Sequence, residues 1–379
     1  MKRLSILLVL CLLLTLLPLS AGAETTGAKG AVLMDLETGT VLFEENAHAK
    51  LPPASVTKVM TMLLVMEAID SGRIGWQDTV TVSEAAAAKG GSQIYLKVGE
   101  TMSVEDMLKS VAVSSANDCA CALAEHIAGS EGAFVEMMNT RAQELGMQDT
   151  HFVNCTGLDD GPDAASHLTC AYDIAIMSRQ LLKYHPDIKK YTTIWMDTVR
   201  GGSFGLSNTD KLVRFYPGAT GLKTGFTASA GYCLSASALR DGMELVAVVL
   251  GCATSQERFS ASKALLDRGF ASYALIRPSL EESKVPVVLG EAETVQAVPG
   301  EDTALLIDKG QKGHITTEIT LEEQLTAPVS KGQRVGTLTI RSGQQILRQV
   351  PLVAQDAVHR LSFGQILLKV LQRLVMAGT

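Results

Sequence analysis

The chain has 379 residues, of which 46% are hydrophobic and 19% are charged, and its formal net charge is −7. This composition is ordinary for a globular protein, and the length is enough for two domains. An acidic chain without a basic cluster is a poor candidate for a nucleic-acid-binding protein, so we expect no nucleic acid among its partners.

The N-terminus has the features of a secretory signal peptide. Lys2 and Arg3 supply the positive start, an apolar segment follows over 6–17, and Ala21-Gly22-Ala23 fits a small-residue cleavage site. The alternative is an uncleaved membrane anchor, but the apolar segment is short and the cleavage site is present. We therefore predict an exported protein whose mature chain begins near Glu24.

The next part of the chain runs from strands through a helical block and back to strands. Strand-like runs over 31–36 and 40–44 flank a glycine turn and predict a β-hairpin. Helical patterns follow over 55–70, 118–128, 134–145, 169–184 and 255–269, with shorter helices opened by Ser83 and Ser103. Strands are expected over 221–225, 231–238 and 243–250. This order predicts an α+β fold, an antiparallel sheet with helices on both faces plus a helical subdomain.

The composition changes near Pro278. From 284 to 353, short strand-like runs are separated by Gly, Asp and Pro turns, which predicts a small all-β domain. In the last segment, apolar residues recur at helical spacing between Phe363 and Leu374, and 359–379 holds three basic residues and no acidic one. This pattern predicts an amphipathic helix on a membrane surface. The alternative is a helix packed on the β domain.

One short stretch carries candidate chemistry. Ser55-Val56-Thr57-Lys58 follows two prolines and precedes an apolar run over 59–66. On a helix, residues three apart are neighbours, so the Ser55 hydroxyl and the Lys58 amine can meet at a helix start. Burial disfavours the charged form of a lysine, which can then act as a base toward the serine. The pattern is weak alone, because Ser260-Ala261-Ser262-Lys263 repeats it and a serine at a helix start is most often an N-cap.

Two further motifs strengthen this interpretation. Ser115-Ala116-Asn117 stands in a polar break between helices, and Lys223-Thr224-Gly225 stands in a strand. Together with Ser55-Val56-Thr57-Lys58, and in this order, they form the motif set of penicillin-binding proteins and serine β-lactamases. The repeat at Ser260 has no such partners downstream.

The resemblance extends over about 24–275. In addition to the three motifs, the chain is similar to the D-alanyl-D-alanine carboxypeptidases of the low-molecular-mass penicillin-binding proteins in Thr150-His151-Phe152-Val153-Asn154, in Gly157-Leu158-Asp159 and in Gly221 to Thr227. This resemblance implies a β-lactamase/transpeptidase-like fold. The implied segments are a signal peptide over 1–23, a serine peptidase domain over 24–278, a small all-β domain over 279–356 and an amphipathic membrane-associating helix over 357–379.

The resemblance also implies catalytic roles. Ser55 would attack the carbonyl between the two terminal D-alanines of a peptidoglycan stem peptide and form an acyl-enzyme. Lys58, as a free amine, would accept the proton, and Ser115 would pass a proton to the leaving amine. Asn117 would bind the substrate amide and orient Lys58. β-Lactam antibiotics would acylate the same serine.

The family resemblance assigns substrate binding to the strand that carries the third motif. Lys223 and Thr224 would bind the terminal carboxylate, and Gly225 would let the peptide lie along the strand edge. The backbone N–H of Phe226 and that of the nucleophile would form the oxyanion hole. Arg258 matches a family arginine that helps to bind the carboxylate, with a surface salt bridge as the alternative.

Other polar residues favour ordinary structural roles. His151 and His167 lack an Asp partner and a G-x-S-x-G elbow, and Asp173 is interpreted as a helix-terminus charge. Six cysteines remain after Cys11, and their alanine-rich and apolar surroundings favour buried thiols over disulfides. We expect no metal and no other cofactor, because no metal-binding spacing is present.

Several alternatives remain open. A β-lactamase shares the three motifs, although the chain has no convincing Glu-x-x-x-Asn motif between Asn117 and Lys223. A non-enzymatic peptidoglycan-binding protein is disfavoured by the intact motifs. A D,D-endopeptidase or transpeptidase would use the same acyl-enzyme. The expected location is the outer face of the cytoplasmic membrane, next to the cell wall.

Overall fold

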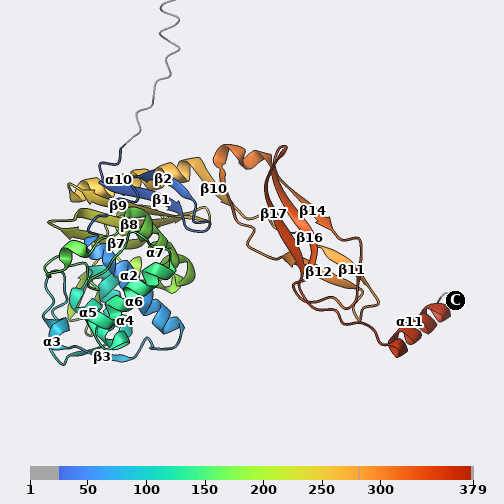
Figure 1. Cartoon of the computed structure of the whole chain (residues 1–379), viewed down its shortest axis with the longest axis horizontal. Coiled ribbons are helices and arrows are strands. Elements are labelled where there is room, and N and C mark those ends of the chain that lie inside the picture. The colour runs from blue at the N-terminus through green and yellow to red at the C-terminus, as the bar shows by residue number, and fades with distance from the viewer. Residues whose placement is uncertain (1–24, 281, 377–379) are drawn as a thin grey trace, which may run out of the picture.

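The computed structural model describes residues 25–280 and 282–376, so the predicted signal peptide lies outside the described residues. Figure 1 shows a large domain of mixed helices and sheet, followed by an elongated β domain and, at the far end, a separate helix. The predicted α+β class with a small all-β domain and a terminal helix is confirmed.

A five-stranded antiparallel sheet supports the large domain, in the order β2-β1-β9-β8-β7. Its strands are β1 (Gly30–Asp35), β2 (Val41–Glu45), β7 (Ala219–Thr227), β8 (Gly231–Arg240) and β9 (Met243–Cys252). The N-terminal hairpin pairs with a strand more than 200 residues later. The strand that carries Lys223-Thr224-Gly225 is therefore an edge strand, with one side open to pairing.

Side chains along each strand point alternately to the two faces of this sheet, and both faces are covered. Ala31 and Leu33 pack into the core beneath helix α10 (Ser255–Ser272). Val32 and Met34 pack into the larger core formed with the helical subdomain. The sheet thus separates α10 from the helical subdomain that carries the first two motifs.

The helical subdomain surrounds α2 (Lys58–Asp70), which is apolar and buried on nearly every side. The other helices are α3 (Glu84–Ala87), α4 (Val104–Ser114), α5 (Asn117–Ala128), α6 (Glu131–Glu144), α7 (Ala171–Tyr184) and α8 (Lys189–Thr192), whereas the short α9 (Leu212–Phe215) packs into the core on the α10 side of the sheet. Short strand pairs join β3 (Thr79–Thr81) to β4 (Thr101–Ser103) and β5 (Met196–Val199) to β6 (Phe204–Ser207). The 3₁₀ turns η2 (Ala164–Ser166) and η3 (Pro186–Ile188) lie in its loops.

Two helix starts differ from the sequence-based expectation. Ser55 lies inside a 3₁₀ turn, η1 (Ala54–Thr57), and the α-helix begins only at Lys58. Because side chains three apart eclipse one another in a 3₁₀ turn, this geometry still places the serine beside the lysine. Helix α7 is capped by Cys170, whose Sγ accepts the N–H of Asp173, one residue after the expected Thr169.

The second domain is a six-stranded sheet in the order β14-β16-β17-β12-β11-β15. Its strands are β11 (Lys284–Val288), β12 (Thr294–Pro299), β14 (Ile315–Leu321), β15 (Leu325–Thr326), β16 (Arg334–Ser342) and β17 (Gln345–Ala354). The sequence analysis missed β12. β13 (Leu305–Asp308) falls within the predicted β domain but pairs outside this sheet, with β10 (Tyr273–Ile276), and the 3₁₀ turn η4 (Lys309–His314) follows it.

The chain closes with α11 (Phe363–Met376). Phe363, Leu367 and Leu371 lie exposed on it, and Ile366, which is half-buried, lines a hollow beside β11 together with the exposed Val370. Within the described residues, no helix combines the length and apolar character needed to cross a membrane.

The six cysteines among the described residues are all buried and free. This confirms the expectation that they act as small apolar core residues. Cys119 and Cys121 lie in α5, and Cys233 and Cys252 lie on the central strands.

We expect the Thr254→Ala variant to lower the free energy of unfolding by about 1 kcal/mol. Thr254 Oγ1 accepts the N–H of Glu257, and the Glu257 carboxylate accepts the N–H of Thr254, which completes a capping box at α10. Urea unfolding followed by circular dichroism measures the change. Gln256→Ala, at an exposed position of the same turn, is the matched control and should change stability by less. Equal losses in the two variants would contradict the capping role.

Candidate active site

Ser55 and Lys58 meet at the junction of η1 and α2. Lys58 Nζ lies 2.9 Å from Ser55 Oγ, and it donates a hydrogen bond of 2.7 Å to the carbonyl of Thr156. The Thr156 carbonyl is a feature that the sequence analysis missed, because 98 residues separate it from Lys58. The amine is therefore held between the serine and a distant loop.

The environment of Lys58 favours its neutral form. The side chain is fully buried within the apolar body of α2 and its neighbours. Burial is the main cause that lowers the pKa of Lys58 well below its usual value, and the charge of Lys223 lowers it further. An amine in this state can accept a proton from the adjacent hydroxyl.

The second motif supplies two buried polar atoms, one on Ser115 and one on Asn117. Ser115 caps the end of α4 in the left-handed region, with φ of +62°, and its Oγ has no hydrogen-bond partner among the described residues. Asn117 Nδ2 donates to the carbonyl of Gly90 at 2.7 Å, and its Oδ1 has no partner in the described part of the chain. A buried group left unpaired is costly, so both atoms are free to pair with a ligand. The amide of Asn117 is thus fixed by Gly90 rather than by Lys58.

The third motif provides a buried cation on the edge strand. Lys223 is 1% exposed, and its Nζ donates to the carbonyl of Thr224 at 3.0 Å. The pKa of Lys223 is lowered to about 7, mainly by burial and also by the charge of Arg258, while the Asp210 carboxyl opposes both. Thr224 Oγ1 donates to Thr209 Oγ1 at 2.7 Å, which ties the strand to the segment that precedes α9.

Gly225 explains how the edge strand approaches the serine turn. A Cβ atom built at this position would lie 2.7 Å from the carbonyl oxygen of Pro53 and 3.1 Å from the backbone nitrogen of Ser55. No side chain fits in this gap, so β7 runs directly against η1. The next residue, Phe226, is 53% exposed, and its ring centroid lies 4.3 Å from that of Tyr232.

Arg258 lies behind this strand rather than at the surface. It is 8% exposed, and its Nη1 donates to the carbonyl of Gly225 at 2.9 Å. Its guanidinium also stands over the ring of Phe259, at 4.8 Å from the centroid. The surface salt bridge considered in the sequence analysis is therefore wrong for this residue. Burial lowers the pKa of Arg258, and the carboxyl of Asp210, whose own pKa is raised to about 7 by burial, is the main group that opposes this.

The other residues considered in the sequence analysis differ in where they lie and in what they contact. Ser260 and Lys263 lie exposed on α10, on the other side of the sheet from Lys58. Asp173 accepts hydrogen bonds from the backbone of Asp149 and the hydroxyl of Thr150 near the start of α7. His151 is exposed, whereas His167 is buried, with Nε2 2.8 Å from Thr57 Oγ1.

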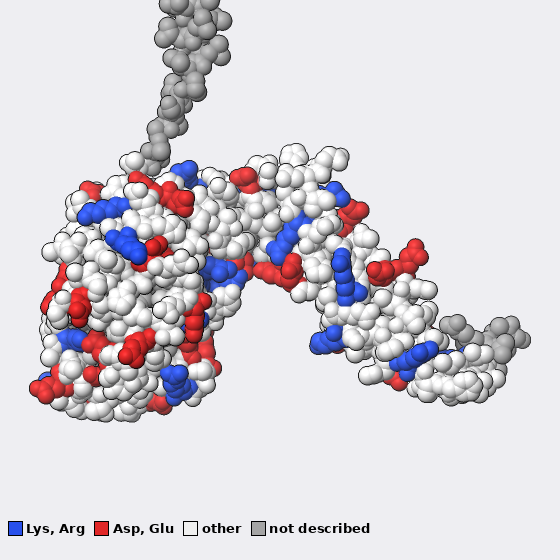
Figure 2. All heavy atoms as spheres, viewed as in Figure 1, with Lys and Arg blue, Asp and Glu red and all other residues white. Residues whose placement is uncertain are grey.

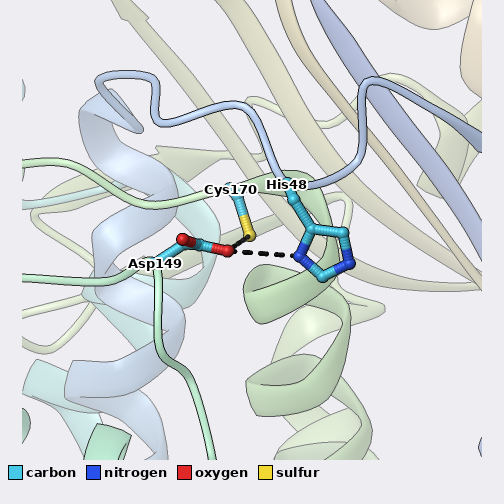
Figure 3. Close-up of side chains that lie close together, drawn as sticks. All are labelled: His48, Asp149 and Cys170. Carbon is cyan, nitrogen blue, oxygen red and sulfur yellow. Dashed lines mark hydrogen bonds and ion pairs between the residues drawn. The ribbon is translucent and has the colours of Figure 1, made fainter.

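A group of potential metal ligands lies apart from the motif residues. Figure 3 shows that His48 and Cys170 both point to the same carboxylate oxygen of Asp149, at 3.2 Å from Nδ1 and 3.9 Å from Sγ. Lys50 lies 3.6 Å from the other oxygen of Asp149 and already balances its charge. Burial raises the pKa of the Cys170 thiol to about 12, and its Sγ is occupied as the cap of α7. The group is satisfied as an ion pair with a buried thiol.

Two family models match this chain. Residues 18–254 match the family described as D-alanyl-D-alanine carboxypeptidase, and residues 270–360 match the C-terminal domain of penicillin-binding protein 5. The D-alanyl-D-alanine carboxypeptidase DacF of Bacillus subtilis (strain 168) is 42% identical over 380 residues and covers 96% of each chain.

Solved structures give the same result. The structure of penicillin binding protein 5 from Haemophilus influenzae superposes with a TM-score of 0.73 at 31% identity, over 88% of this chain and 98% of that one. Penicillin-binding protein D2 from Listeria monocytogenes, in its ampicillin-bound form, superposes with a TM-score of 0.59 at 32% identity, over 64% of this chain and 98% of that one. This chain therefore belongs to the D-alanyl-D-alanine carboxypeptidase family.

Proposed function

We propose that this chain removes the terminal D-alanine from peptidoglycan stem peptides that end in D-Ala-D-Ala, through an acyl-enzyme on Ser55. D-alanyl-D-alanine carboxypeptidase activity is the activity of its family. One observation carries the choice of residues: Lys58 Nζ lies 2.9 Å from Ser55 Oγ, fully buried and with a lowered pKa.

Acylation follows from this arrangement. Ser55 Oγ attacks the carbonyl carbon between the two D-alanines while its proton moves to the Lys58 amine. The oxyanion is stabilised by the backbone N–H groups of Ser55 and Phe226, which the close approach at Gly225 supports. Ser115 relays a proton to the leaving amine, so D-alanine departs as the Ser55 ester forms. Water then hydrolyses the ester and regenerates the hydroxyl.

Binding uses the edge strand. The stem peptide lies along the open side of β7 as an added strand, with its amide group at Asn117 Oδ1, Nδ2 or both. Lys223 and Thr224 bind its terminal carboxylate. Arg258 supports the binding of this carboxylate through its hydrogen bond to the Gly225 carbonyl and through its positive charge. β-Lactams present a similar carboxylate and acylate Ser55 as covalent inhibitors.

We propose the segment boundaries of the sequence analysis for the mature protein, with export directed by 1–23 and the peptidase domain ending at 278. We also propose that 357–379 associates with the outer face of the cytoplasmic membrane. Phe363, Leu367 and Leu371 lie exposed on α11, and in Figure 2 the end of the molecule that carries α11 is mostly uncharged. An apolar face of this kind binds the membrane interface.

Labelled penicillin tests the nucleophile. We expect label on the peptide that contains Ser55, and we expect Ser55→Ala to lose both label and D-alanine release from a peptide ending in D-Ala-D-Ala. Ser260→Ala, which changes the chance repeat on α10, is the matched control and should keep both. Label on a peptide without Ser55 would contradict the mechanism, and penicillin hydrolysis without D-alanine release would indicate a β-lactamase.

The pH dependence tests the role of Lys223. In the free enzyme its pKa is about 7, so it loses its charge as the pH rises through that value. We expect kcat/KM for the peptide to fall on this alkaline side by about tenfold per pH unit, because the carboxylate then lacks its cation. In Lys223→Arg the charge persists, so the alkaline limb should move to higher pH. An unchanged limb in that variant would contradict the assignment.

Single substitutions on α11 test membrane association. Leu371→Asp places a charge on the apolar face, and Gln372→Asp places the same charge at the exposed next position. We expect Leu371→Asp to reduce cosedimentation with vesicles of anionic and zwitterionic phospholipids, and Gln372→Asp to reduce it less. Deletion of 357–379 should abolish it. Equal binding by the two aspartate variants would contradict an apolar anchor.

A further inference from the structure

A buried histidine joins the two chain segments that hold Ser55 and Lys58. His167 is 4% exposed and follows η2, and its ring packs edge-on against Phe152 at 5.7 Å between centroids. One ring nitrogen contacts the serine turn and the other contacts the loop before Thr156. The carboxypeptidase mechanism above gives His167 no role.

The hydrogen bonds assign the proton on this ring. His167 Nδ1 accepts the backbone N–H of Val153 at 3.1 Å, so Nδ1 carries no proton. The proton of the neutral ring is then on Nε2, which donates to Thr57 Oγ1 at 2.8 Å. The Thr57 hydroxyl in turn donates to the carbonyl of Ala54 at 2.8 Å. These bonds form one directed chain from the loop to the residue before Ser55.

The last residue in this series of hydrogen bonds, Ala54, has an unfavourable backbone conformation. Ala54 has φ of +48°, in the left-handed region that an alanine rarely adopts. Its carbonyl also packs against Gly157, where an added Cβ would lie 1.8 Å from the Ala54 oxygen. Because Ser55 is the next residue, the orientation of the Ala54 peptide decides where Ser55 Oγ points.

The contact of His167 with Val153 leads to the segment that holds Lys58. Val153 begins the short segment that ends at Thr156, whose carbonyl accepts the hydrogen bond of Lys58 Nζ. One imidazole thus connects to both sides of the Ser55–Lys58 pair without touching either residue through a hydrogen bond.

We infer that His167 is a positioning residue for acylation: through Thr57 it holds the Ala54 peptide so that Ser55 Oγ stays aligned with Lys58 Nζ. The inference rests on the proposed function for the roles of Ser55 and Lys58. Misalignment of reacting atoms by about 1 Å is enough to lower a rate about 100-fold. The hydrogen bond from Nε2 to Thr57 is the contact that matters.

The imidazole ring of His167 is neutral at neutral pH. The pKa of His167 is lowered to about 4, mainly by burial and to a lesser extent by positive charge at His151 or Lys58. Protonation would place a proton on Nδ1 and break the bond from Val153. Above about pH 5 the directed chain of hydrogen bonds is therefore intact.

Three substitutions separate the two contacts. In His167→Gln the amide nitrogen takes the place of Nε2 and keeps a donor for Thr57. In His167→Asn the amide oxygen takes the place of Nδ1 and keeps an acceptor for Val153. His167→Phe keeps the shape of the ring and removes both. His151→Gln, at an exposed histidine nearby, is the matched control.

The measurement is the acylation of Ser55 by labelled penicillin, resolved into the rate constant at saturation and the apparent dissociation constant. We expect His167→Phe to lower the rate constant about 10- to 100-fold and to leave the dissociation constant within about twofold. His167→Gln should recover most of the rate, and His167→Asn should not. His151→Gln should match the unaltered protein.

Clear outcomes would overturn the inference. A purely structural role would give His167→Phe a lower melting temperature with an unchanged acylation rate constant. Recovery by His167→Asn rather than by His167→Gln would place the effect on Val153 instead of Thr57. If His167→Phe fails to fold, Thr57→Val decides: it keeps the side-chain shape and must lower the same rate constant, and normal acylation in that variant overturns the inference. Failure of the unaltered protein to acylate Ser55 would instead overturn the proposed function.

Discussion

The removal of Lys58 from water is the constraint on which the rest of the site depends. If Lys58 lay in an open cleft, water would stabilise its ammonium form, and the lysine would stay protonated at neutral pH. Here α2 is apolar on nearly every side, so the lysine enters the core with the helix. The apolar run after Lys58 therefore has a chemical consequence as well as a packing role. The buried charge of Lys223 acts in the same direction.

A second constraint is the contact between segments that are distant in the sequence. The 3₁₀ turn that carries Ser55, the loop around Gly157 and the edge strand at Gly225 approach one another at backbone distance. Glycine is required where a Cβ would overlap a carbonyl oxygen or a backbone nitrogen. The motif glycine of β7 thus serves the geometry of the serine turn first, and any binding of a peptide follows from that geometry.

Much of this molecule could be predicted from patterns of a few residues. The α+β class, the N-terminal hairpin and the strands of β7 to β9 follow from alternation and turn signals, which are local. The pairing of Ser55 with Lys58 follows from their spacing. The 3₁₀ start of the helix could not be predicted in this way, because the choice between a 3₁₀ turn and an α-turn depends on tertiary contacts at Ala54 and Gly157. β12 was missed because its alternation, with Val295 and Ala297 buried, covers only a few residues before Pro299.

The contacts of the site were harder to predict for a similar reason. The Thr156 carbonyl, the Gly90 carbonyl and the hydrogen bond of Thr209 are made by groups with no sequence signature. Arg258 was expected either at the surface or at the carboxylate, and its burial behind β7 depends on the packing of α10 against the sheet. His167 was interpreted as structural because no acid accompanies it, whereas its partners are a backbone amide and a threonine hydroxyl.

The six buried thiols have a consequence for how the chain can recover from unfolding. In the folded protein none of them is exposed, so oxidants in solution reach them slowly. Outside a reducing compartment, an unfolded chain presents all six at once, and disulfides between them close loops that the native core does not accept. Refolding then competes with oxidation, and each opening of the core carries a chance of becoming permanent. The durability of this protein under oxidising conditions is consequently set by how rarely it opens rather than by its equilibrium stability alone.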